Sequence, residues 1–211
     1  MTLPGLISQQ SILRNGEWLG VPDSRQWTQD RPCVQLQMVW PESRLTSPPV
    51  PRVPAGYELR CWRPDDEPQW LELMNKVDLG DWDHDRLVRT LPKILPDGFF
   101  VIEHKPSRRI VATAMATHSA TEQHPFGGEL GWVAGDPQHQ GRGLGMAVCA
   151  AVTARLLRAG YHNIYLRTDD HRLPAIKTYL KLGFVPLLFC DGMRDRWQDL
   201  FRKIAWPGPL P

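Results

Sequence analysis

One stretch of the sequence limits the fold more than any other: a glycine turn between an apolar strand pattern and a long alanine- and leucine-rich segment. It reads GELGWVAGDPQHQGRGLG and continues as MAVCAAVTARLLRAGY. Residues 129–134 have the composition of a strand, and residues 145–159 have the apolar spacing of a helix. A strand, a glycine turn and a helix in this order favour an α/β architecture.

The turn itself, QGRGLG at residues 140–145, has the character of an anion-binding loop. Backbone N–H groups at a helix N-terminus point outward, and the helix macrodipole favours negative charge there. Glycines let the backbone approach a ligand closely, and Arg142 adds a positive charge. The turn therefore suits a diphosphate ligand. The alternative is a tight turn that binds nothing.

Two common phosphate-binding motifs do not fit the rest of the chain. A Walker A loop needs Gly-Lys-Ser/Thr, which the sequence lacks. A Rossmann fingerprint opens a series of parallel strands, and the 66 residues after Gly145 suffice for only two strands. The surrounding sequence therefore has to decide what the turn binds.

A proline-rich connector divides the chain. Residues 41–54 contain five prolines, which resist helix and central strand. We expect residues 1–54 to form an N-terminal extension and linker, and residues 55–211 to form the main domain. The extension carries two strand patterns, at 12–19 and 34–40. It is too short for its own core, so it packs on the main domain or on a second copy in a homodimer.

After the connector, apolar periodicity predicts a mixed α/β domain. The order of its elements is β-α-α-β-β-β-α-β-α-β-α. The predicted strands are 57–62, 99–103, 110–118, 129–134, 163–168 and 184–190, and the predicted helices are 64–77, 83–95, 145–159, 175–182 and 191–204.

Charge and composition narrow the choice of partners. The formal net charge is +2, with no concentrated Lys and Arg stripe, so no nucleic-acid partner is expected. No run of 18 apolar residues is present, so no membrane span is expected. The four cysteines are scattered, which predicts no metal site, no disulfide framework and free thiols in a cytoplasmic protein. They are Cys33, Cys61, Cys149 and Cys190.

Two motifs together resemble the GNAT (Gcn5-related) N-acetyltransferases over about residues 55–190. The first is Gln-x-x-Gly-x-Gly at the start of a helix, and the second is AIxxYxxxGF on the following helix and strand. The resemblance implies an α/β (α+β) GNAT fold, with a mixed, mostly antiparallel central sheet, splayed central strands and flanking helices. The motif residues are Gln140, Gly143, Gly145, Ala175, Ile176, Tyr179, Gly183 and Phe184.

The resemblance also implies acetyl-CoA as co-substrate. Pantetheine would lie along the backbone of residues 133–135, and the N–H groups of residues 141–146 would bind the pyrophosphate. A backbone N–H near Val133 would stabilise the oxyanion, and Arg172 stands where many members have an asparagine that contacts CoA. The residues expected to bind the cofactor are Val133, Ala134, Gly135, Gln140, Gly141, Arg142, Gly143, Leu144, Gly145, Met146 and Arg172.

Two residues match catalytic positions of the family. Tyr179 resembles the general acid that protonates the CoA sulfur, and the alternative is a packing tyrosine. Glu129 resembles the glutamate that histone-type members use as a general base through a water, and the alternative is an exposed strand carboxylate. Because a free lysine amine has a pKa near ~10.4, an acceptor amine has to lose a proton before it attacks.

The acceptor site is less well defined. Family members line it with the loop between the first two helices, so Trp82 and His84 are candidates to contact substrate, and a surface loop is the alternative. Arg167 stands where the ribosomal-protein acetyltransferases have a catalytic glutamate, so that substrate class is in doubt. Arg167 or Arg172 would instead contact a phosphate or an acidic acceptor, and the alternative is solvation at the surface. Residues 166–186, with the Trp-containing helix that follows, also resemble mycothiol-synthase-like members, which carry two such domains.

Two functions follow from these patterns. The first is an acetyl-CoA-dependent N-acyltransferase that moves an acetyl group to a primary amine of a small molecule or a protein, by direct attack in a ternary complex. The second is a non-catalytic acyl-CoA-binding or sensing module, in which Glu129 and Tyr179 would be dispensable.

Overall fold

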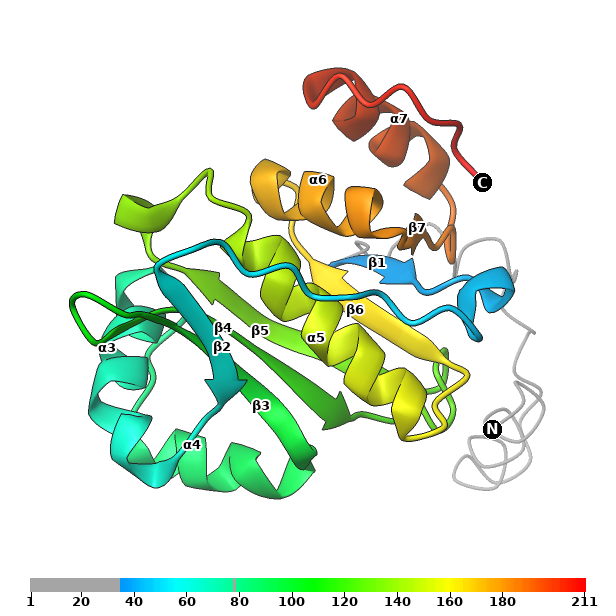
Figure 1. Cartoon of the computed structure of the whole chain (residues 1–211). Helices are drawn as coiled ribbons and strands as arrows, with labels where there is room; N and C mark the ends of the chain where they lie inside the picture. Colours follow the sequence, from blue (N-terminus) through cyan, green and yellow to red (C-terminus); the bar gives the residue numbers. More distant parts are fainter. Residues whose placement is uncertain (1–34, 78) are drawn as a thin grey trace, which may run out of the picture.

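A seven-stranded sheet forms the centre of the molecule, in the order β2-β3-β4-β5-β6-β1-β7 (Figure 1). This computed structural model describes residues 35–77 and 79–211. Neighbouring strands are antiparallel except β5 and β6, which are parallel, so the predicted mixed, mostly antiparallel sheet is confirmed. The strands are β1 Leu36–Val39, β2 Tyr57–Cys61, β3 Ile94–His104, β4 Arg109–His118, β5 Gly128–Gly135, β6 Ile164–Thr168 and β7 Val185–Pro186.

Helices cover both faces of this sheet (Figure 1). The helices are α3 Glu67–Lys76, α4 His84–Thr90, α5 Leu144–Arg158, α6 Leu173–Leu182 and α7 Met193–Lys203, with short 3-10 turns η1 Glu42–Arg44, η2 Pro64–Asp66, η3 Leu91–Lys93 and η4 Pro137–His139. Helix α5 packs on one face, and α3 and α4 pack on the other. Strand β4 shows the division, because Ala114 and Ala116 belong to the α5 core while Met115 belongs to the α3/α4 core.

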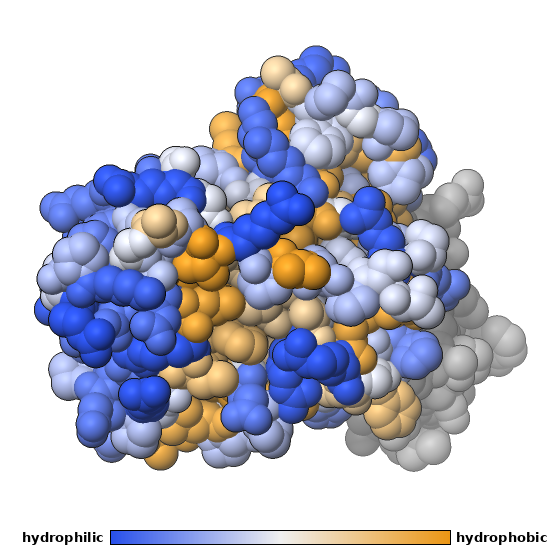
Figure 2. All heavy atoms as spheres, viewed as in Figure 1, coloured by the Kyte–Doolittle hydropathy of each residue, from blue (hydrophilic) through white to orange (hydrophobic). Residues whose placement is uncertain are grey.

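Apolar side chains remain visible on the α5 side of the molecule. Figure 2 shows them gathered over the middle of this face, with hydrophilic residues on both sides. The connector from β1 to β2 passes in front of α5 in the same view (Figure 1). Leu45 and Val53 of the connector pack against the core that contains α5, so the connector lies on the face of the sheet that this helix covers.

Three predicted elements differ in extent from the structure. Strand β3, at Ile94–His104, is longer than the predicted strand 99–103. The helix predicted for 83–95 ends at Thr90, and β3 already begins at Ile94. Pro92 explains the difference, because proline lacks the N–H that a continuing helix needs. The strand predicted for 184–190 is shorter than expected, since only Val185 and Pro186 pair with β1.

Strand β1 lies inside the sheet, although it belongs to the predicted extension. It pairs antiparallel with β6 on one side and with β7 on the other. Leu36 and Met38 are fully buried against the α5 core. The sequence left two locations open, the chain's own main domain or a second copy. In the structure, β1 pairs within the chain's own sheet. The pattern at 12–19 lies outside the described residues, and the homodimer stays a prediction.

The composition led to expectations about membrane spans, metal sites and cysteines, and the described residues can be compared with each of them. None of their helices is long and apolar enough to cross a membrane, and they contain no group of three or more His, Cys, Asp or Glu that could hold a metal ion. Cys61 and Cys149 are free thiols, but Cys190 is disulfide-bonded, so the expectation of free thiols is wrong there. Burial raises the pKa of Cys149 to about 12, as expected of a core thiol. The cytoplasmic location stays a prediction.

Candidate active site

The central strands β5 and β6 diverge shortly after they meet. They pair in parallel only at Gly128 with Ile164 and at Glu129 with Tyr165. Beyond these pairs the strands separate, and the N-terminus of α5 follows the open end of β5. The fork matches the splayed central strands that the sequence resemblance implied.

A cavity of about 690 Å³ opens at this fork. It is lined by the end of β5, the glycine turn, the start of α5 and residues of α6. All the residues expected to bind the cofactor line it except Arg142. Tyr179 lines it as well, whereas Glu129, Trp82 and His84 do not. The cavity is therefore built mainly from residues that the two motifs and their flanks predict.

The glycine turn leaves the start of α5 open toward the cavity. Gly141 and Gly143 have φ angles of 75° and 80°, in the left-handed region that disfavours other residues. Gly143 is the N-cap of α5, and no side chain caps the helix. A Cβ atom at either glycine would meet no described atom within 4 Å. The first N–H groups of α5 are thus available to an anion.

A β-bulge shapes the wall that β5 contributes. Thr113 of β4 faces Ala134, and Met115 faces Gly131, so Trp132 and Val133 together oppose a single residue of β4. Trp132 has a φ of 53°, which is uncommon for an aromatic residue. The bulge takes the backbone of Val133 out of the regular ladder, beside the cavity. This is the region where the sequence resemblance places the oxyanion-stabilising N–H.

Positive side chains surround the same cavity. Arg172 precedes α6, and its Nη2 donates to the carbonyl oxygen of Val133 at 3.1 Å, across the fork. Lys177 and Lys181 also line the cavity. The acidic residue there, Asp136, accepts hydrogen bonds from Lys76 at 2.9 Å. The cavity therefore suits a polyanionic ligand.

Asp136 is held in its charged form at the edge of this cavity. Burial alone would raise the pKa of Asp136, but hydrogen bonds from the Gln138 N–H and from Lys76 outweigh it and hold the pKa below its usual value. The same carboxylate caps η4, the 3-10 turn that leads into the glycine turn. Asp136 thus fixes the approach to the anion-binding loop.

Tyr179 offers a proton on the wall of the cavity. It lies on the buried face of α6 with Ile176 and Leu180 and is only 3% exposed. Burial raises the pKa of Tyr179 well above its usual range. The hydroxyl therefore stays protonated at neutral pH, as a proton donor must.

Glu129 has a different setting. Its carboxylate is buried on β5 and forms a bidentate pair with Arg167 of β6, with distances of 2.9 Å from Nε and 3.1 Å from Nη2. The hydrogen bond to Glu129 raises the pKa of Arg167. Neither alternative in the sequence analysis, an exposed carboxylate or a solvated arginine, foresaw this pair. No local sequence signal reports it, because it depends on the register of two distant strands.

Trp82 and His84 lie away from the cavity. Trp82 is 4% exposed and packs against Trp70 and Trp132 in the α3/α4 core. The side chain of His84 is largely exposed and contacts Glu67 at 2.7 Å. The hydrogen bond that His84 donates to the Glu67 carboxylate raises the pKa of His84. Trp82 supports the bulge at Trp132 rather than facing the cavity.

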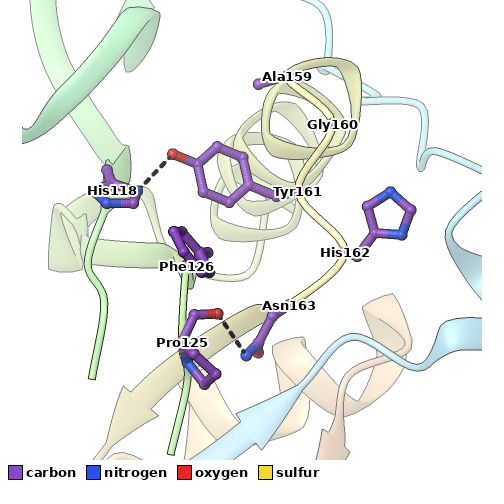
Figure 3. A pocket seen from close by; sticks show the side chains of 8 residues that line it. All are labelled: His118, Pro125, Phe126, Ala159, Gly160, Tyr161, His162 and Asn163. Carbon is purple, nitrogen blue, oxygen red and sulfur yellow. Dashed lines mark hydrogen bonds between the residues drawn. The ribbon is translucent and has the colours of Figure 1, made fainter. Parts of the chain in front are cut away.

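A second cavity, of about 400 Å³, lies at the other end of α5 (Figure 3). Its wall is largely aromatic and includes Phe126, Tyr161 and His118. Two pairs of polar groups contact each other there, since His118 Nδ1 lies 2.9 Å from the Tyr161 hydroxyl and Asn163 Nδ2 donates to the Pro125 oxygen at 3.4 Å.

The geometry of the fork is that of a known family. Residues 57–184 match the Acetyltransferase (GNAT) family. Because this match spans more than half of the chain, the protein belongs to the GNAT acetyltransferase family.

Relatives agree with this membership. A mycothiol acetyltransferase from Thermobispora bispora is 32% identical over 163 residues, which cover 72% of this chain and 55% of that protein. The enzyme of the same name from Nocardia farcinica is 30% identical over 199 residues, which cover 83% of this chain and 65% of that protein. The chain thus spans between half and two thirds of the length of these relatives.

Solved structures share the fold. A GCN5-related N-acetyltransferase from Sphaerobacter thermophilus superimposes with a TM-score of 0.59 at 22% identity, over 74% of this chain and 50% of that one. A tandem GNAT protein from the clavulanic acid biosynthesis pathway gives a TM-score of 0.53 at 18% identity, over 74% of this chain and 51% of that one.

Proposed function

We propose that the protein transfers an acetyl group from acetyl-CoA to a primary amine of a small molecule or a protein, by direct attack in a ternary complex, in the cytoplasm. One observation carries the proposal: a single cavity is lined both by the uncapped glycine turn and by Tyr179. The turn suits a pyrophosphate, and the tyrosine suits a departing thiolate.

Acetyl-CoA would supply the acetyl group as a thioester. The N–H groups of residues 141–146 and the guanidinium of Arg172 would hold its phosphates, and Arg142 at the rim would add charge. A backbone N–H near Val133, at the β5 bulge, would donate a hydrogen bond to the thioester oxygen. As the amine nitrogen bonds to the carbonyl carbon and the C–S bond breaks, Tyr179 would donate its proton to sulfur.

The amine proton needs an acceptor as well. We propose Glu129, acting through a water, because it is a buried carboxylate on the strand that forms the wall of the cavity. Its pairing with Arg167 fixes the carboxylate in place. An acceptor of the mycothiol type belongs in any test panel, because the curated relatives carry that name.

The test measures release of free CoA from acetyl-CoA with a panel of primary amines. We expect turnover by the wild type and a loss of about 10²–10⁴-fold in kcat for Tyr179→Phe, with acetyl-CoA binding retained. Tyr161→Phe is the matched control, because Tyr161 lies at the second cavity. Tight binding of acetyl-CoA without turnover of any amine would contradict the enzymatic proposal and favour a binding module.

A further inference from the structure

Arginine side chains hold both ends of α6, the helix that carries Tyr179. At its start, Arg172 donates to the carbonyl oxygen of Val133 at 3.1 Å. At its end, Arg44 Nη1 donates to the carbonyl oxygen of Leu182, the last residue of the helix, at 3.2 Å. The last carbonyls of a helix lack partners within it, and a cation stabilises this negative end of the dipole. Arg44 therefore caps α6 from the connector between β1 and β2.

Gly183, directly after α6, makes room for this arginine. A Cβ atom at Gly183 would collide with the guanidinium group of Arg44. Gly183 also has a φ of 121°, a conformation that residues with a side chain rarely adopt. Its N–H group and that of Phe184 both donate to the carbonyl oxygen of Tyr179, at 3.0 Å each. The turn that Arg44 contacts is thus built on the backbone of Tyr179 itself.

Aromatic rings form a second contact between the connector and Tyr179. The ring of Trp40 packs edge-to-face with that of Phe184, with centroids 5.2 Å apart, and Phe184 packs against Tyr179 at 6.5 Å. Trp40 Nε1 donates to the carbonyl oxygen of Arg44 at 3.1 Å, and the guanidinium lies 5.8 Å from the Trp40 ring centre. All three aromatic residues are buried. The indole thus supports Arg44 and packs against the ring that contacts Tyr179.

We propose that Arg44 and Trp40 are positioning residues for Tyr179. They hold the last turn of α6 so that the tyrosine hydroxyl stays at the wall of the cavity proposed to bind acetyl-CoA. The inference rests on the proposed acetyl transfer, because only there does the hydroxyl have a sulfur to protonate. Both residues precede the family match at 57–184. The connector thus completes a site whose other proposed residues lie in the matched domain.

The first test compares kcat with the affinity for acetyl-CoA. Arg44→Ala should lower kcat about three- to tenfold, because small displacements of a catalytic group slow the reaction. The acetyl-CoA Kd should change less than about twofold, since Arg44 does not line the cavity. Arg44→Lys keeps a cation at the end of α6 and should recover most of kcat. Arg109→Ala is the matched control, because it removes an exposed arginine that pairs with Glu72 of α3, and it should leave both quantities near their wild-type values.

A double-mutant cycle separates positioning from a general effect on the fold. Residues that act as one unit lose activity non-additively. In the Tyr179→Phe background, Arg44→Ala should therefore lower kcat by less than about twofold. Trp40→Phe, which keeps a ring but loses the hydrogen bond to the Arg44 oxygen, should show the same pattern with a smaller loss. If Arg44→Ala lowers kcat equally in both backgrounds, it acts on the fold and not through Tyr179, and the inference is wrong.

Tyrosine-selective NMR tests the same contact without turnover. The Tyr179 ring signal is assigned by its loss in Tyr179→Phe. It should shift in Arg44→Ala and keep its position in Arg109→Ala, with thermal unfolding as the check that each variant is folded. An unmoved signal in Arg44→Ala overturns the inference. Absence of turnover by the wild type with any amine overturns the proposed function and the catalytic role of Arg44 with it, while the ring signal still reports whether Arg44 holds Tyr179.

Discussion

The two ends of α5 look alike in sequence and behave differently in the structure. Each has a left-handed glycine beside a cavity: Gly143 with φ of 80° at the start and Gly160 with φ of 83° after the end. At the start no side chain caps the helix. After the end, the N–H groups of Gly160 and Tyr161 donate to carbonyls of the last turn, at 3.0 and 3.2 Å.

The difference shows what makes one glycine turn a binding site and the other a helix end. A left-handed glycine only turns the chain. The start of α5 keeps unsatisfied donors at the positive end of the helix dipole, while the far end satisfies its carbonyls within the chain. The far cavity likewise pairs its own polar groups, as His118 does with Tyr161 (Figure 3). We therefore expect the start of α5 to bind the ligand, and its far end to contribute only to the stability of the fold.

The largest expected effect is on stability, at the far end. Leu156→Ala removes a fully buried side chain of α5 and should lower the free energy of unfolding by about 2–5 kcal/mol. The acetyl-CoA Kd should stay within about twofold, measured by titration calorimetry below the unfolding temperature. A large loss of affinity in this variant would show that the two ends are coupled and that the comparison fails.

The glycines themselves give the sharpest contrast. Gly143→Ala and Gly160→Ala each put a side chain in the left-handed region, which should lower the free energy of unfolding by about 1–2 kcal/mol. Only Gly143→Ala should weaken acetyl-CoA, by about tenfold or 1.4 kcal/mol, because its methyl group lies in the turn that faces the cavity. Denaturant unfolding and calorimetry measure the two quantities. Equal losses of affinity would contradict a binding role confined to the N-terminal end.

The smallest expected effect is a pH dependence of stability. Burial raises the pKa of Tyr179 at one end and of Tyr161 at the other. Above about pH 10 the unfolded chain loses these protons while the folded chain keeps them. Stability is therefore fully present below pH 10 and is lost as the pH rises further. Tyr179→Phe should flatten this decline more than Tyr161→Phe, since Tyr179 is more deeply buried; unfolding curves between pH 9 and pH 11 provide the check.

The sequence predicts the start of α5 well because its signals are local. The residues of the glycine turn and Tyr179 follow from short motifs at fixed spacing, and all but Arg142 of the expected cofactor residues line one cavity. Their binding role stays a prediction. The position of α5 between β5 and β6 also follows from local periodicity.

Contacts between distant segments could not be predicted in the same way. The pair of Glu129 and Arg167 depends on where two parallel strands align across an intervening helix. Trp82 was expected at the acceptor site because of its place in the loop between the first two helices, but it packs on Trp70 and Trp132 from other elements. Strand β1 had two expected locations, and only its pairing with β6 and β7 decided between them.

That placement of β1 also has a consequence for synthesis on the ribosome. Leu36 pairs with Thr168 and Met38 with Pro186, so β1 emerges long before either neighbour exists. At about 5–20 residues per second, the wait is roughly ten seconds. Contacts between segments this far apart in sequence also form slowly. The first strand of the described sheet to be synthesised is thus expected to be among the last to pair, and Leu36 and Met38 have no sheet to be buried in until then.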